Sequence, residues 1–329
     1  FHKRELITLL LLFLLIVAAA CSAKPGAGGS QATVYKIGFV AAVTGPASTL
    51  GEPEGEVAAM LQKQLDAAGG IKGPDGVLHP VKIIVQDSEG SGDVAVPMVS
   101  MASSSAIVEP VAERQWIFKS AQSNRHTAPW QVRYVKALGI TKIANFYVNN
   151  AYGEDGRDGI RAAAAQEGVE IVLEDSFGAT DTDMTAQLTK LKASGAEALL
   201  VTATPPAASI LTKQFHEMGL DIPLVHNHGI GMASFITLST PEAAEGVVFP
   251  MGKLVAASAL PDSDPQKQVL LDFMAAYEKE TGKKPSTFAG HAWDATQLVL
   301  KGLETFPNGL SLSEQRAKLR DAIEATQGF

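Results

Sequence analysis

Two histidines that flank a single asparagine have the most evident capacity for chemistry. His226 and His228 directly follow a short apolar run that ends at Val225. Alternate residues of an extended strand point to the same side, so two imidazoles at this spacing can bind one metal ion, as in some hydrolases. The sequence holds no His-Glu-x-x-His motif and no cysteine pair to complete such a site. A metal-dependent hydrolase is therefore kept as an alternative, while the reading we favour has no catalytic residue, no cofactor and no metal.

Two hydroxyl-rich segments offer a different chemistry, the binding of a carboxylate. Residues 44–48 (Thr-Gly-Pro-Ala-Ser) lead from a predicted strand toward a predicted helix, and Ser48 is the candidate ligand-binding residue of this segment. Free N–H groups at a helix N-terminus carry partial positive charge, which suits a carboxylate. Residues 100–105 (Ser-Met-Ala-Ser-Ser-Ser) are a second strand end with clustered hydroxyls. A plain strand–helix turn and ordinary helix capping explain the same patterns without a ligand.

Strands that alternate with helices are expected to position these residues. Apolar runs predict strands at 35–43, 81–85, 143–148, 169–173 and 198–203, with a short one from Leu224. Amphipathic patterns predict helices at 52–68 and 154–166, and around 184–191 and 210–218. This alternation predicts an α/β fold with parallel sheets covered by helices. Ligands of such sheets bind at the carboxyl ends of the strands, where the three candidate segments lie.

Helices dominate the last third of the sequence. Asp264 and Pro265 predict the start of one helix, and the capping box of Ser311 and Glu314 predicts another. Between them a helix is predicted over 291–303. Asp294 then stands near the start of its helix, where a carboxylate stabilises the helix, and this role is favoured over catalysis.

The N-terminus has the three-part layout of a secretory signal peptide. His2, Lys3 and Arg4 precede a charge-free run from Leu6 to Ala20, and the alanines at its end lead to Cys21 in a pattern that resembles a bacterial lipobox. The run is shorter than the ~20 apolar residues of a membrane-spanning helix. We expect residues 1–21 to be a signal peptide ending at the lipidation site Cys21, and residues 22–33 to be a flexible tether. A signal peptide without lipid is the alternative.

Composition limits the class of partner. The net charge is −8 and 46% of the residues are hydrophobic. An acidic chain argues against nucleic acid and against an anionic membrane surface as partners. About 300 residues follow the tether, enough for two ordinary domains. Because Cys21 is the only cysteine, no disulfide forms within this sequence.

Six short segments, in this order, resemble the solute-binding proteins of ABC importers, of the branched-chain amino-acid type. They are residues 36–47, 67–71, 97–100, 150–154, 183–192 and 290–295. The resemblance implies a two-lobed type I periplasmic-binding-protein fold, each lobe a parallel sheet flanked by helices. Lobe one is expected at 34–119 plus 254–329 and lobe two at 120–253.

The same resemblance implies a function. We expect an exported, monomeric, non-enzymatic receptor, in the periplasm or lipid-anchored at the outer face of the cytoplasmic membrane. It is expected to close its lobes on a small carboxylate or amino acid and to deliver this ligand to an ABC permease. A ligand-sensing receptor of the same fold stays an alternative.

Ligand-binding positions also follow from the resemblance. Ser103 and Ser104 match the segment that binds the α-carboxylate of the ligand through backbone N–H and a hydroxyl, and Tyr152 and Thr204 match positions that line the cleft. His228 falls where amino-acid binders place a Glu for the ammonium group of the ligand. A neutral imidazole is a poorer partner for ammonium, so this departure favours an aromatic or aliphatic carboxylate without ammonium.

Lobe one departs from the resembled pattern at one connection. Asp87 to Val96 alone join the second predicted strand to Pro97, where the family places a helix, a strand and another helix. Ten residues cannot hold a crossover helix. We therefore expect lobe one to be incomplete, with an uncovered sheet face and a gap beside the cleft. The absence of an initial Met and the family's further strands beyond Phe329 lead us to expect an incomplete sequence.

Overall fold

The computed structural model describes residues 32–44, 48–74, 76–87, 96–307 and 309–329. The predicted lipidation site, Cys21, lies outside these ranges, as do the predicted signal peptide and most of the tether. Within the described ranges, none of the helices combines the length and the apolar character needed to cross a membrane.

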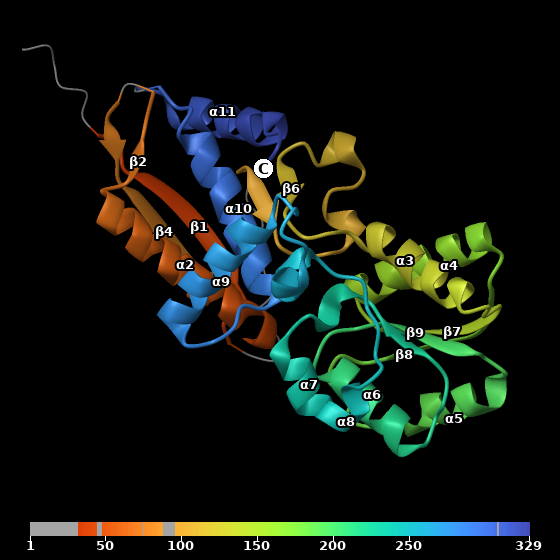
Figure 1. Ribbon diagram of the computed structural model, residues 1–329. Helices are drawn as coiled ribbons and strands as arrows, with labels where there is room; N and C mark the ends of the chain where they lie inside the picture. Colours follow the sequence, from red (N-terminus) through yellow and green to blue (C-terminus); the bar gives the residue numbers. More distant parts are fainter. Residues whose placement is uncertain (1–31, 45–47, 75, 88–95, 308) are drawn as a thin grey trace, which may run out of the picture.

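One body of the fold contains both ends of the described chain (Figure 1). Its strands pair two by two: β1 (Tyr35–Ala41) with β4 (Val81–Asp87), β2 (Ile71–Lys72) with β3 (Leu78–His79), and β5 (Met98–Ser100) with β6 (Ile117–Lys119). The first and last pairs are parallel. Its helices are α2 (Ser48–Ala68), α9 (Lys267–Thr281), α10 (Thr287–Leu303) and α11 (Leu312–Ala325), with short 3-10 turns at η1 (Ser105–Ile107), η2 (Val111–Glu113) and η4 (Lys253–Ala259).

The other body is a four-stranded parallel sheet in the order β10-β9-β7-β8. Its strands are β7 (Lys142–Val148), β8 (Glu170–Phe177), β9 (Ala198–Thr202) and β10 (Leu224–His226). Its helices are α3 (Asn124–Ala137), α4 (Ala151–Glu167), α5 (Thr185–Ser194), α6 (Ala207–Glu217), α7 (Ala233–Ser239) and α8 (Pro241–Ala244), with the 3-10 turn η3 at His228–Ile230. The strands predicted from apolar runs at 143–148 and 198–203 are thus confirmed within a residue or two.

Buried apolar side chains gather separately in the two bodies. One core combines β1, β4 and α2 with α9 and α10, although these segments are far apart in the sequence. Two further cores lie on the two sides of the β7–β10 sheet. The chain passes between the bodies twice, after β6 and again between α8 and η4 (Figure 1). Leu50 and Phe288 of the first body pack against a core of the second, so the two bodies are in contact.

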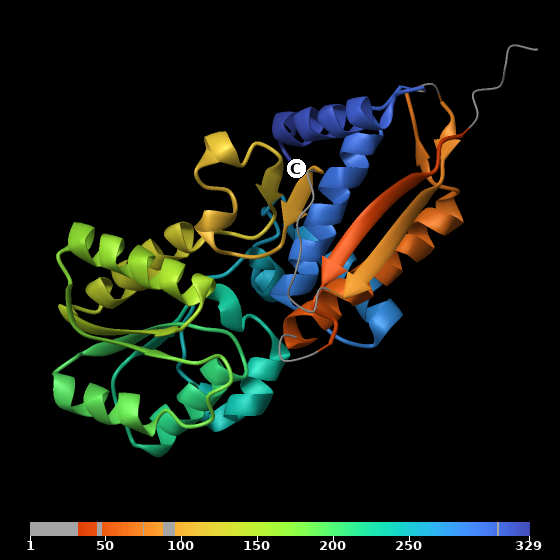
Figure 2. The same cartoon turned by 180° about the vertical axis from the view of Figure 1, so that it is seen from behind.

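The sheet of the first body is divided. Among the described residues, β1 pairs with β4 alone and β5 with β6 alone, and α10 is seen between the two pairs (Figure 2). Val40 on β1 is 56% exposed and Ile84 on β4 is 43% exposed, so helices cover only one face of the β1–β4 pair. This is the arrangement that the short connection from Asp87 to Val96 predicts.

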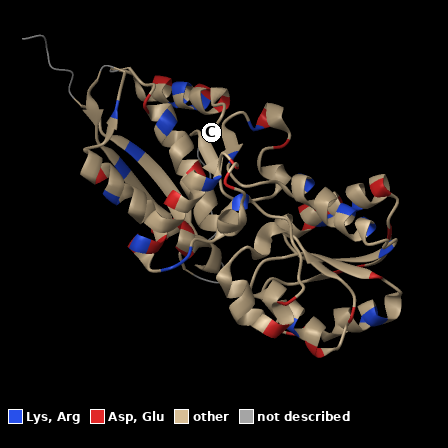
Figure 3. Cartoon of the chain, in the orientation of Figure 1, with Lys and Arg blue, Asp and Glu red and all other residues tan. Residues whose placement is uncertain are grey.

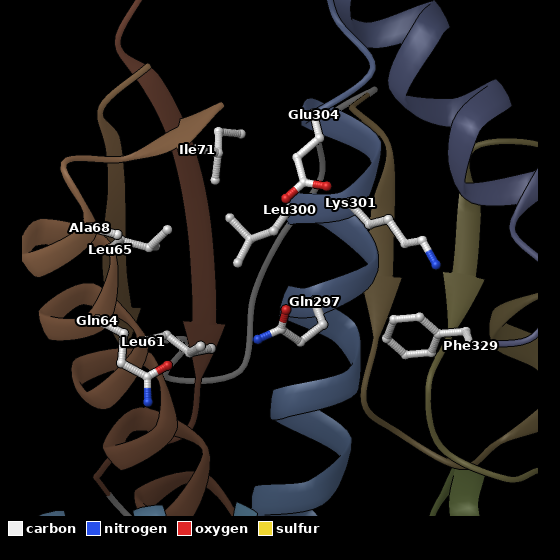
Figure 4. A pocket seen from close by; sticks show the side chains of 10 residues that line it. All are labelled: Leu61, Gln64, Leu65, Ala68, Ile71, Gln297, Leu300, Lys301, Glu304 and Phe329. Carbon is white, nitrogen blue, oxygen red and sulfur yellow. The ribbon is translucent and has the colours of Figure 1, made fainter. Parts of the chain in front are cut away.

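A cavity of about 370 Å³ lies between α2 and α10. Leu61, Leu65 and Ile71 form one wall, and Leu300, Lys301 and Phe329 form the other (Figure 4). None of the six residues predicted to bind a ligand lines it.

Two helices begin at other residues than the sequence analysis predicted. Helix α10 begins at Thr287, because the Ser286 hydroxyl accepts a hydrogen bond from the Ala289 N–H, and not near His291. Asp294 therefore lies in the middle of α10 and not at its N-terminus. Helix α9 begins at Lys267 and not at Pro265. The capping box of Ser311 and Glu314 at the start of α11 is confirmed.

Charged side chains of both signs are interleaved along the outer helices of both bodies (Figure 3). Many form surface ion pairs, such as Lys283 with Glu56 and Arg133 with Glu167. Exposed pairs of this kind each stabilise a fold by at most about 1 kcal/mol. The cores, and not these pairs, therefore supply most of the stability.

We expect Glu54→Gln to stabilise the protein at alkaline pH. Burial in α2 raises the pKa of Glu54 to about 7, so the folded state holds this proton more tightly than the unfolded state. The free energy of unfolding therefore decreases as the pH rises through the folded-state pKa. Removal of the charge should raise the free energy of unfolding by about 2–3 kcal/mol at pH 8 and by under about 1 kcal/mol at pH 5.

Urea unfolding at the two pH values measures this difference. The matched control is Glu278→Gln on the exposed side of α9, which should change neither value by more than about 0.5 kcal/mol. An equal effect of Glu54→Gln at pH 5 and pH 8 would show that Glu54 is not protonated in the folded protein.

Candidate functional site

The loop that follows β5 is held by a lysine from the neighbouring strand. Lys119, the last residue of β6, pairs with Ser100 at the end of β5. Its Nζ donates to the carbonyl oxygens of Ser103 at 2.7 Å and of Ser104 at 3.0 Å. It also donates to the Ser123 hydroxyl at 2.9 Å, just before α3. One ammonium group thus fixes two successive peptide planes of the serine loop.

These two peptide planes leave donors unused. In a trans peptide the N–H points opposite to the carbonyl, so the N–H groups of Ser104 and Ser105 point away from Lys119. Among the residues that the structure describes, neither N–H has a hydrogen-bond acceptor. The Ser104 hydroxyl is buried and also has no partner there. Three adjacent donors of this kind suit one carboxylate, because hydrogen bonds from backbone N–H to an anion are among the stronger ones.

His228 faces this loop from the other body. It opens the 3-10 turn η3 directly after β10, and only 3% of its surface is exposed. Its Nε2 lies 2.7 Å from the Ser103 hydroxyl. Burial, and next the electrostatic effects of His291 and Lys119, lower the pKa of His228 to about 3. The ring is therefore neutral at physiological pH, and it joins the two bodies through one hydrogen bond.

His291 and Lys119 complete a group of cationic or cationisable side chains. His291 lies on α10 and its carbonyl accepts a hydrogen bond from the Ser120 hydroxyl at 2.9 Å. Burial and the charge of Lys119 lower the pKa of His291 to about 4. Burial lowers the pKa of Lys119 itself to about 8, and Asp155 opposes this shift. Such a group favours an anionic ligand.

Tyr152 and Thr204 meet His228 around Gly229. A Cβ atom at Gly229 would lie 2.6 Å from the Tyr152 hydroxyl and 3.0 Å from Thr204 Cγ2, so only glycine fits between them. The Tyr152 ring stands edge-on to the His228 ring, with 6.0 Å between centroids. Burial raises the pKa of Tyr152, which keeps its phenol protonated.

Five of the six predicted residues are thus gathered by direct or shared contacts: Ser103, Ser104, Tyr152, Thr204 and His228. Ser48 begins α2, and no hydrogen bond joins it to the other five among the described residues. Lys119, His291 and Asp155 were not predicted. Lys119 ends a strand beside the serine loop, and this position was the only sequence signal that pointed to it.

The two histidines do not form the metal pair that their spacing allowed. His226 Nε2 lies 2.9 Å from the Thr212 hydroxyl on α6, whereas His228 faces Ser103. The chain turns into η3 after His226, so the alternation of an extended strand ends there. Within the described ranges, no three His, Cys, Asp or Glu side chains are grouped to hold a metal ion.

Comparison with known proteins identifies the family of this chain. The family model described as periplasmic binding protein matches residues 95–329. The chain belongs to the periplasmic binding protein family. Membership of this family makes the protein a binding protein and not an enzyme. The alternative of a metal-dependent hydrolase is therefore wrong.

Relatives of this periplasmic binding protein include a leucine-, isoleucine-, valine-, threonine-, and alanine-binding protein of Pseudomonas aeruginosa. That protein is 22% identical over 83% of this chain and 79% of its own. A Leu/Ile/Val-binding protein homolog of Brucella melitensis is 24% identical over 82% of this chain and 78% of its own.

Solved structures show the same fold. An extracellular ligand-binding receptor from Rhodopseudomonas palustris has a TM-score of 0.77 and 23% identity, with 90% of each chain covered. The LivJ substrate-binding protein from Streptococcus pneumoniae, solved in complex with isoleucine, has a TM-score of 0.72 and 23% identity over 90% of this chain and 89% of that one. The predicted fold class, parallel sheets flanked by helices in the type I periplasmic-binding-protein arrangement, is confirmed.

Proposed function

We propose that this protein is an extracytoplasmic receptor of an ABC importer that closes two lobes on a small carboxylate. The observation that carries the proposal is the set of unused donors at Ser104 and Ser105, next to Ser103, whose hydroxyl is hydrogen-bonded to His228 of the other body. Lobe one is proposed to span 34–119 and 254–329, and lobe two 120–253. Closure requires a ligand that binds the closed form better than the open form.

The available donors are sufficient for useful affinity. A dissociation constant of about 1 μM corresponds to about −8 kcal/mol. Hydrogen bonds to a charged group contribute about 1.5–3 kcal/mol each, so three donors to a carboxylate and one buried apolar group reach this value. Tyr152 and Thr204, which flank Gly229, are proposed to line the apolar part of the cleft.

The ligand class follows from the charges around the donors. Two curated relatives are named for branched-chain amino acids, which makes these the first candidates. His228, however, stands where the resemblance expects a Glu for the ligand ammonium, and the ammonium group of Lys119 lies close to the same serine loop. We therefore propose a carboxylate without an ammonium group, such as 3-methylpentanoate or benzoate.

Delivery to a permease and lipid anchorage at Cys21 are proposed on the N-terminal sequence and on family membership. A lipid at Cys21 and the tether behind it would hold a monomeric receptor near the permease and raise its effective concentration there. Metabolic labelling with a radioactive fatty acid tests the anchor, with Cys21→Ser as the control that must lose the label.

A thermal-shift screen tests the binding function. The panel contrasts L-leucine, L-isoleucine and L-valine with 3-methylpentanoate, 4-methylpentanoate and benzoate. We expect stabilisation by the carboxylates that lack ammonium, and its loss in the double variant Ser104→Ala/His228→Ala. A folded protein that no member of the panel stabilises would contradict the proposed function.

Lys119 is expected to act on the ligand through the serine loop. Lys119→Met removes the ammonium that fixes the Ser103 and Ser104 carbonyls, so the N–H donors lose their common direction. We expect about a tenfold loss of carboxylate affinity, equivalent to about 1.4 kcal/mol, measured by calorimetry. Lys213→Met on the exposed side of α6 is the matched control and should bind normally. Normal binding by Lys119→Met would mean that the loop is held without this lysine.

A further inference from the structure

Hydrogen bonds decide which nitrogen of His228 carries the proton. The backbone N–H of His228 donates over 2.7 Å to the side chain of Asn227, so this amide atom is the oxygen Oδ1. The imidazole Nδ1 lies against the same oxygen and therefore also donates to it. In the neutral ring Nε2 then holds a lone pair, which accepts the hydrogen bond from the Ser103 hydroxyl.

Asp155 fixes the same arrangement from the other end. Its carboxylate accepts from Asn124 Nδ2 at 2.8 Å, which turns Asn124 Oδ1 toward Asn227. Asn227 Nδ2 donates to that oxygen at 3.0 Å, which leaves Asn227 Oδ1 for His228. The side chains Asp155, Asn124, Asn227 and His228 thus form one directed relay that ends at the Ser103 hydroxyl. A transfer of the His228 proton from Nδ1 to Nε2 would break this relay.

A carboxylate that binds the Ser103 hydroxyl meets an obstacle in this arrangement. It must replace Nε2 of His228 as the acceptor of the hydroxyl, and its oxygens then face the Nε2 lone pair. Two acceptors without a proton between them, in a buried site, lose hydrogen bonds that water would have supplied. A proton on Nε2 removes this cost, because Nε2 then donates to the carboxylate while Nδ1 keeps its bond to Asn227.

We propose that His228 takes up one proton from the solvent when the cleft binds a carboxylate, so that ligand affinity rises as the pH falls. The proposal rests on the proposed function of the cleft as a carboxylate site. The proton adds to Nε2 of His228, only hydrogen bonds are exchanged, and the products are an imidazolium and a carboxylate in contact.

The groups that face His228 set the range of pH. Lys119 on β6 and His291 on α10 oppose a charge on His228. From α4, Tyr152 presents the edge of a protonated phenol, and Asp155 supplies the negative end of the relay. His226 on β10 is turned toward Thr212 and takes no part.

Burial and the electrostatic effects of His291 and Lys119 lower the pKa of His228 to about 3, and an opposite charge in contact raises a pKa by about 1–3 units. The bound-state pKa is therefore higher than the pKa without ligand. The association constant therefore rises as the pH falls from the pKa of His228 with ligand bound toward its pKa without ligand. The rise is at most about tenfold per pH unit. The carboxylate ligand itself stays mostly ionised above about pH 5. Direct contact of an imidazolium with a carboxylate corresponds to the upper part of this range of pKa increases, about 2–3 units, so the rise is expected below about pH 6.

Isothermal titration calorimetry of the mature protein with 3-methylpentanoate, benzoate and L-isoleucine tests the proposal. Each titration is made at pH 5.5 in two buffers with different ionisation enthalpies, which gives the number of protons taken up, and the affinity is measured from pH 7.5 to pH 5. We expect an uptake of about 0.2–0.8 proton at pH 5.5 and an affinity gain of about two- to tenfold between pH 7.5 and pH 5 for the two carboxylates.

Variants assign the proton to His228. In His228→Gln the side-chain amide can donate to the carboxylate without ionising, so the affinity that remains should show no proton uptake and no dependence on pH. His216→Gln, at an exposed position of α6, is the matched control and should keep both.

Two outcomes would overturn the proposal and leave the receptor function intact. The first is carboxylate binding without proton uptake in the unaltered protein, and the second is proton uptake that persists in His228→Gln. Binding of L-isoleucine alone, without proton uptake, would overturn it as well. If none of the three compounds binds the folded protein, both the proposal and the proposed function fail.

Discussion

The His228→Glu variant is expected to reverse the ligand preference of the cleft. L-isoleucine and 3-methylpentanoate differ only by an ammonium group, so the ratio of their affinities isolates the recognition of that group. In the unaltered protein the ammonium meets a neutral imidazole next to the charge of Lys119, and 3-methylpentanoate should bind more tightly. A carboxylate at position 228 accepts hydrogen bonds from an ammonium and lies near Lys119 and His291, so it is not left unpaired.

The expected change in the affinity ratio is about 10- to 100-fold, because a hydrogen bond to a charged group contributes about 1.5–3 kcal/mol. Calorimetric titration of both ligands measures the ratio. His228→Gln has a similar size without the charge and should weaken the preference without reversing it. A His228→Glu variant that still prefers 3-methylpentanoate would show that position 228 does not face the α-carbon substituent of the ligand.

The sheet of the second body was predictable because its signal is local. Apolar runs at 143–148 and 198–203 are strands in the structure because they are buried on both faces by helices that neighbour them in sequence. The start of α10 was placed four residues too late, although Ser286 is a strong N-cap residue. The prediction followed the apolar pattern, which becomes dense only after His291, and overlooked the cap.

The site was predictable only where it follows from strand ends. Ser103 and His228 each follow a strand of a parallel sheet, and both were proposed for that reason together with the resemblance. Their contact joins residues 125 positions apart and depends on how the two bodies meet. The relay through Asn124 and Asp155 likewise depends on the packing of α3 against α4 and η3. Residue types and spacing carry no record of such contacts.

The prediction of a shared metal site at His226 and His228 was wrong because the alternation of side chains along a strand was extended beyond the end of that strand. The rule that alternate side chains share a side holds only while the strand continues. The strand ends at His226, and η3 begins at His228, whose backbone N–H is capped by Asn227. The same short turn that separates the two imidazoles brings His228 to the serine loop.

Ser105→Pro is expected to remove a single ligand-binding donor while it preserves the fold. Ser105 is the first residue of η1, a position where proline is well tolerated. Ser104 before it has a ψ of 135°, which suits a residue that precedes proline. The change deletes the Ser105 N–H, which has no acceptor among the described residues. We expect a 10- to 100-fold loss of carboxylate affinity, with the free energy of unfolding changed by under about 1 kcal/mol.

Ser105→Ala separates the backbone from the side chain. It keeps the N–H and removes the hydroxyl, whose contact with Asp155 is long at 3.4 Å, so its affinity should stay within about threefold of the unaltered protein. Titration calorimetry and urea unfolding of both variants make the comparison. If Ser105→Pro and Ser105→Ala bind equally well, the ligand does not use this N–H. If both lose affinity to the same extent, the hydroxyl and the relay through Asp155 hold the ligand in place of the backbone.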